Sequence, residues 1–128
     1  MKPAWLTSDE VIALHDEALA EFGGRAGIRD AGLLESALAK PRNLAAYNDD
    51  PSIFDLAAAY AVGIARNHPF VDGNKRMAFL AAAVFLDLYG YELTPTETEV
   101  VDTMIRLAKG AIGQKRLSIW FRNVASSK

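Results

Sequence analysis

Two ten-residue segments of this chain, 56–65 and 77–86, are apolar on nearly every side of the helix that each would form. A surface helix carries a polar face, so a helix without one must be surrounded by protein. The many alanines in both segments allow neighbouring helices to approach closely. The sequence therefore predicts a fold built around two central, buried helices, with a short polar stretch between them.

Helix signals recur along the rest of the chain. Thr7–Glu10 and Ser52–Asp55 have the spacing of capping boxes, which predicts helices that run to Phe22 and to about Asn67. Asp30 is a suitable cap for a helix that we expect to stop near Pro41, since proline disrupts a helix interior.

Three further helices are expected in the C-terminal half. The first covers about Asn74–Tyr89, the second starts from a cap at Thr94 and continues to Gly110, and the last is short and capped by Ser118. No stretch alternates like a β-strand. We therefore expect an all-α fold of six to seven helices in a single domain, 1–128.

Composition limits the function classes. The 128 residues are 51% hydrophobic and 23% charged with a net charge of −2, which is ordinary for a globular protein and lacks the basic excess of a non-specific nucleic-acid binder. There is no cysteine, and the apolar runs fall short of the roughly 20 residues that a membrane span needs. The first ten residues turn polar too early for a signal peptide. We expect a cytoplasmic protein with no membrane and no direct nucleic-acid partner.

The polar stretch HPFVDGNKR, His68–Arg76, places several charged groups beside an apolar core. Residues 72–75 lie where a helix is expected to start, and the free N–H groups and positive dipole of a helix N-terminus attract anions. Lys75 and Arg76 add positive charge there, and Asp72 is a hard oxygen ligand suited to Mg²⁺. The structural alternative is that Asp–Gly–Asn only forms a turn, for which these residues are common, and that the two cations of the first turn are only exposed to solvent.

Histidine changes its charge near neutral pH and can take a proton from a hydroxyl group. His68 is therefore a candidate general base beside the candidate anion site. Cations at a helix N-terminus oppose the dipole, which favours a bound anion over a merely structural turn. A base, a metal ligand and an anion site together are typical of phosphate transfer from a nucleotide to a hydroxyl.

The stretch HPFVDGNKR resembles the signature of the Fic/Doc superfamily, H-x-F-x-[D/N]-[A/G]-N-[K/G]-R, and Leu6–Leu38 resembles the N-terminal half of its Doc branch. The resemblance covers most of the chain and implies a Fic/Doc-like fold in which the two buried helices flank this loop. It also implies a role for each residue of the motif: His68 as base for a target threonine, Asp72 as ligand of Mg²⁺, and Gly73, Asn74, Lys75 and Arg76 as phosphate ligands of ATP.

Two positions separate the branches of this superfamily. Members that transfer AMP resemble H-P-F-x-x-G-N-G-R-x-x-R, whereas Lys75 stands here in place of the second glycine and Phe79 in place of the last arginine. The resemblance to the N-K-R branch implies a toxin kinase that transfers the γ-phosphate of ATP to elongation factor Tu and arrests translation. Transfer of AMP to a protein hydroxyl and a non-catalytic helical binding module, such as a corepressor, are the alternatives.

The same resemblance implies a partner. Toxins of this branch belong to type II toxin–antitoxin systems, and they are monomers inhibited by a Phd-like antitoxin whose disordered tail folds as a helix in a groove of the toxin. Tyr47–Pro51 falls where family members place a flap over the target segment. His15 is expected to be structural, and the sequence leaves the roles of Arg66, Trp5 and Trp120 open.

Overall fold

The computed structural model describes residues 4–128, so residues 1–3 of the expected 1–128 domain lie outside the described residues. Six helices and one two-stranded sheet form the described part: α1 (Ser8–Phe22), α2 (Ala31–Tyr47), α3 (Ile53–Asn67), α4 (Asn74–Asp87), β1 (Tyr91–Leu93), α5 (Glu97–Ala108), α6 (Gln114–Val124) and β2 (Ala125–Ser127). The expected all-α fold is confirmed. The short antiparallel pair β1–β2, which pairs Glu92 with Ser126, is the one element that the sequence did not predict.

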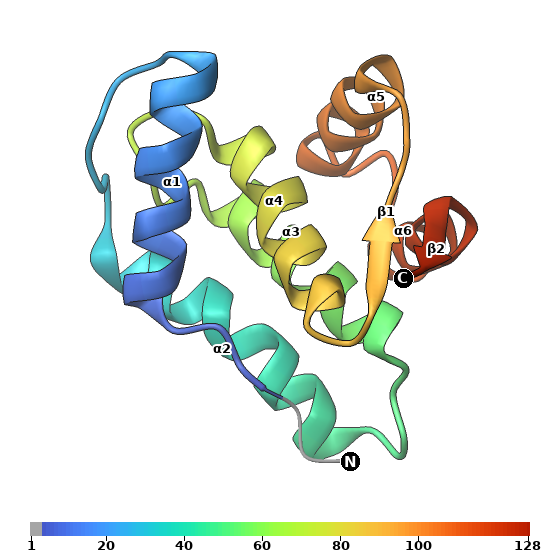
Figure 1. The fold of residues 1–128 in the computed structure, drawn as a ribbon. Helices are drawn as coiled ribbons and strands as arrows, with labels where there is room; N and C mark the ends of the chain where they lie inside the picture. Colours follow the sequence, from blue (N-terminus) through green and yellow to red (C-terminus); the bar gives the residue numbers. More distant parts are fainter. Residues whose placement is uncertain (1–3) are drawn as a thin grey trace.

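Helices α3 and α4 lie at the centre of the molecule, with α1 and α2 on one side and α5 and α6 on the other (Figure 1). Helix α3 packs against α2, α4, α5 and α6, and residues 56–65 are all buried. At Gly63 an added methyl group would lie 2.9 Å from backbone atoms of Ala37, so only glycine allows α2 to approach α3 this closely. The prediction of two central helices is confirmed.

Side-chain caps set most helix starts. The capping boxes at Thr7–Glu10 and Ser52–Asp55 are both formed, and the side chain of Asp30 caps α2. The stop expected at Pro41 is wrong, because α2 continues to Tyr47 with Pro41 buried inside it. Leu44 and Ala45 in the following turn pack against the core. Tertiary packing there outweighs the roughly 3 kcal/mol that an interior proline costs a helix.

The start of α5 differs from the expected one. Its cap is Thr96, whose side chain accepts a hydrogen bond from the N–H of Glu99 at 3.2 Å, and not Thr94. The N–H of Thr94 instead donates to the carbonyl of Val124 at 3.0 Å, which extends the pairing of strands β1 and β2 by one hydrogen bond.

The bounds of α6 and α4 also differ. Helix α6 begins at Gln114, and Ser118 lies buried within it, where its hydroxyl donates to the Asp55 carboxylate at 2.6 Å. The serine therefore joins two helices and does not start one. Helix α4 ends at Asp87, two residues before the expected end. Among residues 4–128, no helix combines the length and the hydropathy that crossing a membrane requires.

Candidate functional site

The loop 68–73 joins the two central helices, and its backbone turns at both ends. His68 ends α3 in a left-handed conformation with φ 49° and ψ 55°. Gly73 precedes α4 with φ 81° and ψ 17°, a region where glycine carries no steric penalty. Phe70 lies between them with no exposed surface and anchors the loop in the core. The loop therefore has a defined shape although it lies beside the surface.

The side chain of Asn74 holds that shape. Its Oδ1 accepts a hydrogen bond from the N–H of Phe70, and its Nδ2 donates to the carbonyl of Phe70, both at 2.9 Å. Asn74 is only 8% exposed, so this amide is occupied within the protein. The phosphate-binding role expected of Asn74 therefore stays a prediction for its backbone N–H group alone.

A second segment, the connection 23–30 between α1 and α2, lies along the loop. The N–H of Val71 donates to the carbonyl of Gly27 at 3.0 Å, and the N–H groups of Arg29 and Asp30 donate to the carbonyl of Pro69 at 2.7 and 3.1 Å. These bonds make a short antiparallel contact centred on Ile28 and Phe70. Sequence reasoning gave this segment no role, because a glycine-rich connection carries no signal for the strand that it will meet.

Arg29 is the residue of that segment which reaches the candidate base. Its Nε donates to the carbonyl of His68 at 2.6 Å, and its terminal nitrogen donates to the carbonyl of Asn67 at 2.8 Å. The backbone of His68 is thus fixed, while its imidazole is exposed and forms no hydrogen bond within residues 4–128. An accessible ring on a fixed backbone suits a base that meets an incoming hydroxyl.

The carboxylate of Asp72 is held by backbone groups. One oxygen accepts from the N–H of Arg25 at 3.1 Å and the other from the N–H of Gly73 at 2.9 Å. Both hydrogen bonds keep the pKa of Asp72 below its ordinary value, and the bond from Arg25 has the larger effect. Each oxygen retains a lone pair, so an ionised carboxylate of fixed orientation remains able to bind a cation.

The start of α4 offers free N–H groups. Unlike α1, α2, α3 and α5, this helix begins without a side-chain cap, and its first turn holds no acidic residue. The first N–H groups of any helix lack partners within it. Lys75 lies in the same turn, is exposed and forms no ion pair in the described part of the chain. The positive end of α4 is therefore open to an anion.

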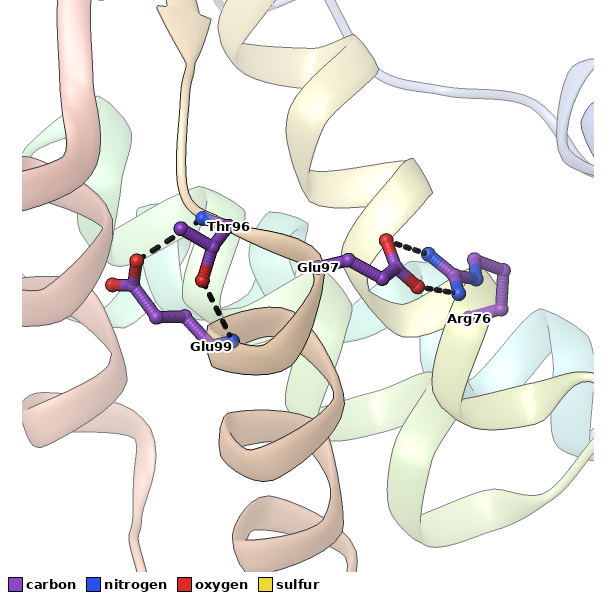
Figure 2. A network of polar contacts seen from close by, with 4 residues as sticks. All are labelled: Arg76, Thr96, Glu97 and Glu99. Atoms are coloured by element: carbon purple, nitrogen blue, oxygen red, sulfur yellow. Dashed lines mark hydrogen bonds and ion pairs between the residues drawn. The ribbon is translucent and has the colours of Figure 1, made fainter.

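Arg76 is less free than the sequence suggested. Figure 2 shows its guanidinium paired through two nitrogens with the carboxylate of Glu97 at the start of α5; the bond from Nη1 to Oε2 is 3.1 Å. The guanidinium also lies 4.2 Å from the centre of the Phe22 ring. The carboxylate raises the pKa of Arg76, and the guanidinium lowers that of Glu97. A phosphate that binds this guanidinium has to compete with Glu97.

An apolar groove of about 270 Å³ begins beside this pair. Its walls come from the first turn of α4 and from one face of α5: Lys75, Arg76, Val100, Val101, Met104 and Ile105. The cationic end of α4 therefore continues into a surface suited to apolar contacts.

The structure shows the contacts of three residues whose roles the sequence left open. Arg66 donates to the carbonyl of Ile112 at 3.2 Å, in the connection between α5 and α6. Trp5 stacks on Phe85, and Trp120 packs edge to face with Phe79. Both tryptophans are half-buried and close the core.

Tyr47–Pro51, where a flap over the target segment is expected, lies at the opposite end of α3 from His68, and the flap stays a prediction. That segment precedes α3 whereas His68 follows it, and a helix of 15 residues spans about 22 Å. Figure 1 shows the two ends of α3 on opposite sides of the molecule. The connection 23–30 does contact the loop 68–73.

Comparisons with known proteins agree on one family. The sequence model described as the Fic/DOC family matches residues 5–86. The chain is 31% identical over 122 residues to the protein named Protein kinase doc of Escherichia phage P1, with 95% of this chain and 96% of that protein covered. It is 47% identical over 74 residues to Toxin Doc of Mycolicibacterium smegmatis, with 56% of each chain covered.

Proposed function

This chain belongs to the Fic/Doc family, and we propose that it is a Doc-type toxin kinase that phosphorylates a threonine of elongation factor Tu. In this reaction the imidazole of His68 removes the proton of the threonine hydroxyl. The hydroxyl oxygen forms a bond to the γ-phosphorus of ATP as the bond to the bridging oxygen breaks, and ADP leaves. Translation stops because the phosphorylated factor no longer functions.

The open N-terminus of α4 is the observation that carries this proposal. The N–H groups of the first turn of α4 are suited to phosphate oxygens, and Lys75 adds a charge that no carboxylate neutralises within residues 4–128. The helix lacks the side-chain cap that four of the other five helices have. A bound polyphosphate would supply the missing acceptors.

The residues present also fit a magnesium ion. In the described part of the chain no group of three or more histidine, aspartate or glutamate side chains could hold a metal. Magnesium often binds one or two carboxylates together with the phosphates of its nucleotide, and Asp72 has the charge and the fixed orientation for this. When bound, the ion would neutralise charge on the phosphates.

Two positions favour the kinase over AMP transfer. Phe79, which stands in place of the last arginine of AMP-transferring members, is half-buried and packs against Trp120. Phe79 therefore gives the second turn of α4 no positive charge that could bind a phosphate. Lys75 is exposed in the first turn, where a glycine would leave only backbone. Both changes alter where the negative charges of ATP can be held.

Labelled ATP tests the reaction directly. Purified elongation factor Tu is incubated with this protein and ATP labelled at either the α- or the γ-phosphate. The kinase predicts label on the factor only from the γ-phosphate, whereas label from the α-phosphate would establish AMP transfer. His68→Ala should lower the rate by about 100-fold or more because it removes the general base, and Arg66→Ala, outside the loop, should leave it unchanged.

Growth arrest separates the kinase from a binding module. Expression of the chain should stop growth of a bacterial host, and His68→Ala should remove the effect while circular dichroism still shows a helical protein. Persistent arrest with the alanine variant would establish a non-catalytic action.

We also propose that an antitoxin inhibits this protein in trans. The relative named Toxin Doc supports such a partner. The groove between α4 and α5 has apolar walls and lies beside Lys75 and Arg76, so a helix with an acidic residue near its apolar face would fit it. Co-expression with a Phd-like protein encoded by a neighbouring gene should relieve growth arrest, and it should fail to do so when Val101 is replaced by Asp.

A further inference from the structure

His15 is a buried histidine outside the motif. It lies on α1 with 2% of its surface exposed, and its ring stacks on Phe70 with a distance of 4.0 Å between ring centres and an angle of 17°. Its Nε2 lies 2.9 Å from the backbone carbonyl oxygen of Asp72. The ring therefore contacts the loop 68–73 twice, once through its face and once through a polar atom.

The direction of the polar contact follows from its acceptor. A carbonyl oxygen only accepts hydrogen bonds, so Nε2 of His15 carries the proton and donates it. Both the neutral tautomer with hydrogen on Nε2 and the charged ring provide this donor. A buried residue that served only to fill space would not need a donor at this position.

The bond to the carbonyl of Asp72 fixes the peptide that joins Asp72 to Gly73. This peptide is trans, and in a trans peptide the C=O and N–H groups point in opposite directions. A carbonyl held toward His15 therefore turns the N–H of Gly73 the other way, where it donates to the Asp72 carboxylate at 2.9 Å. A methyl group added to Gly73 would lie 3.7 Å from Nε2, so the ring packs directly behind this peptide.

We propose that His15 is a positioning residue: its Nε2–H group orients the Asp72–Gly73 peptide so that the Asp72 carboxylate and the start of α4 face the nucleotide. The inference rests on the proposed function, because it takes Asp72 as the ligand of Mg²⁺. His15 contacts neither substrate nor metal in this role. It acts through the Asp72–Gly73 peptide, which its Nε2–H group holds.

Two variants separate the donor from the ring. His15→Phe keeps an aromatic ring against Phe70 but removes the donor, whereas His15→Gln keeps a donor at the end of its side chain but removes the ring. Groups that hydrogen-bond to a metal ligand without touching the metal change metal affinity or activity by about 10- to 100-fold when they are removed. We expect His15→Phe to raise the half-saturating Mg²⁺ concentration by about tenfold or more, and His15→Gln to restore most of the parent affinity.

The backbone N–H of Gly73 reports on the same peptide without any activity. In ¹⁵N-labelled protein its resonance should shift and exchange faster with solvent in His15→Phe, and it should return toward the parent position in His15→Gln. This measurement decides the role of His15 even if the parent neither binds Mg-ATP nor phosphorylates a target. In that case the proposed function fails and the positioning role is judged by this resonance alone.

Three results would overturn the inference. One is a folded His15→Phe variant with the parent Gly73 resonance and the parent Mg²⁺ dependence. Another is a glutamine variant that changes the Gly73 resonance as much as phenylalanine does, which would mean that a hydrogen-bond donor at this position does not hold the peptide. The third needs no variant: ring ¹⁵N shifts of the unmodified protein that place the only proton of His15 on Nδ1.

Discussion

The amide of Asn74, the first residue of α4, should contribute more to stability than any single hydrogen-bonding side chain of the loop 68–73. Its two bonds, both 2.9 Å long, satisfy the N–H and the carbonyl of Phe70, a residue with no exposed surface. Asn74→Ala leaves both groups without partners. A buried polar group that loses its partner costs about 1–3 kcal/mol, so we expect the free energy of unfolding to fall by roughly 2–4 kcal/mol.

Asn67→Ala is the matched control. The amide of Asn67 makes one bond, from Nδ2 to the carbonyl of Leu33 at 3.0 Å, in a partly buried place. Both residues lie at a helix end, so the gain in helix propensity from alanine is similar and cancels in the comparison. We expect a loss of about 1 kcal/mol for this variant.

Urea unfolding followed by circular dichroism measures both variants, with linear extrapolation to water. The reasoning is refuted if Asn74→Ala loses no more stability than Asn67→Ala at the same slope. Such a result would mean that water or a backbone shift satisfies Phe70. Asn74→Asp extends the test: it keeps the acceptor for the N–H of Phe70 but sets a carboxylate oxygen against the carbonyl, so it should rescue little.

Two further predictions concern the charges around α4. Glu97→Gln should tighten binding of ATP by up to about fivefold, because the nucleotide then no longer competes with Glu97 for Arg76, and an ion pair at the surface contributes at most about 1 kcal/mol. A calorimetric titration measures this, and Glu99→Gln is the control, since it keeps the capping box in the same turn and leaves Arg76 paired (Figure 2). The pKa of Asp72 is depressed in the folded state, so its contribution to stability is complete above about pH 4 and is lost only as pH falls through the lower, folded-state pKa. Carboxyl ¹³C shifts followed with pH check this, and a midpoint at or above the ordinary value contradicts it.

Much of the fold follows from rules that act within one or two helical turns. The capping boxes at Thr7 and Ser52 join residues three apart, and the structure forms both where the sequence predicts them. The apolar segment 56–65 is buried throughout because it has no face that water can solvate. The start of a helix at Asn74 was also predicted, since it depends on adjacent residues.

The arrangement around the site depends on residues far apart in the chain. Arg29 reaches the carbonyl of His68, 39 residues away, and His15 reaches that of Asp72, 57 residues away. Glu97 pairs with Arg76 because α5 packs beside α4. The sequence by itself determined the two central helices, the capped starts of α1, α2 and α3, and the place of the polar loop between α3 and α4. Only the packing of helices against one another decided which groups hold the residues of that loop in place, because hydrophobic periodicity specifies a buried face but not the partner that covers it.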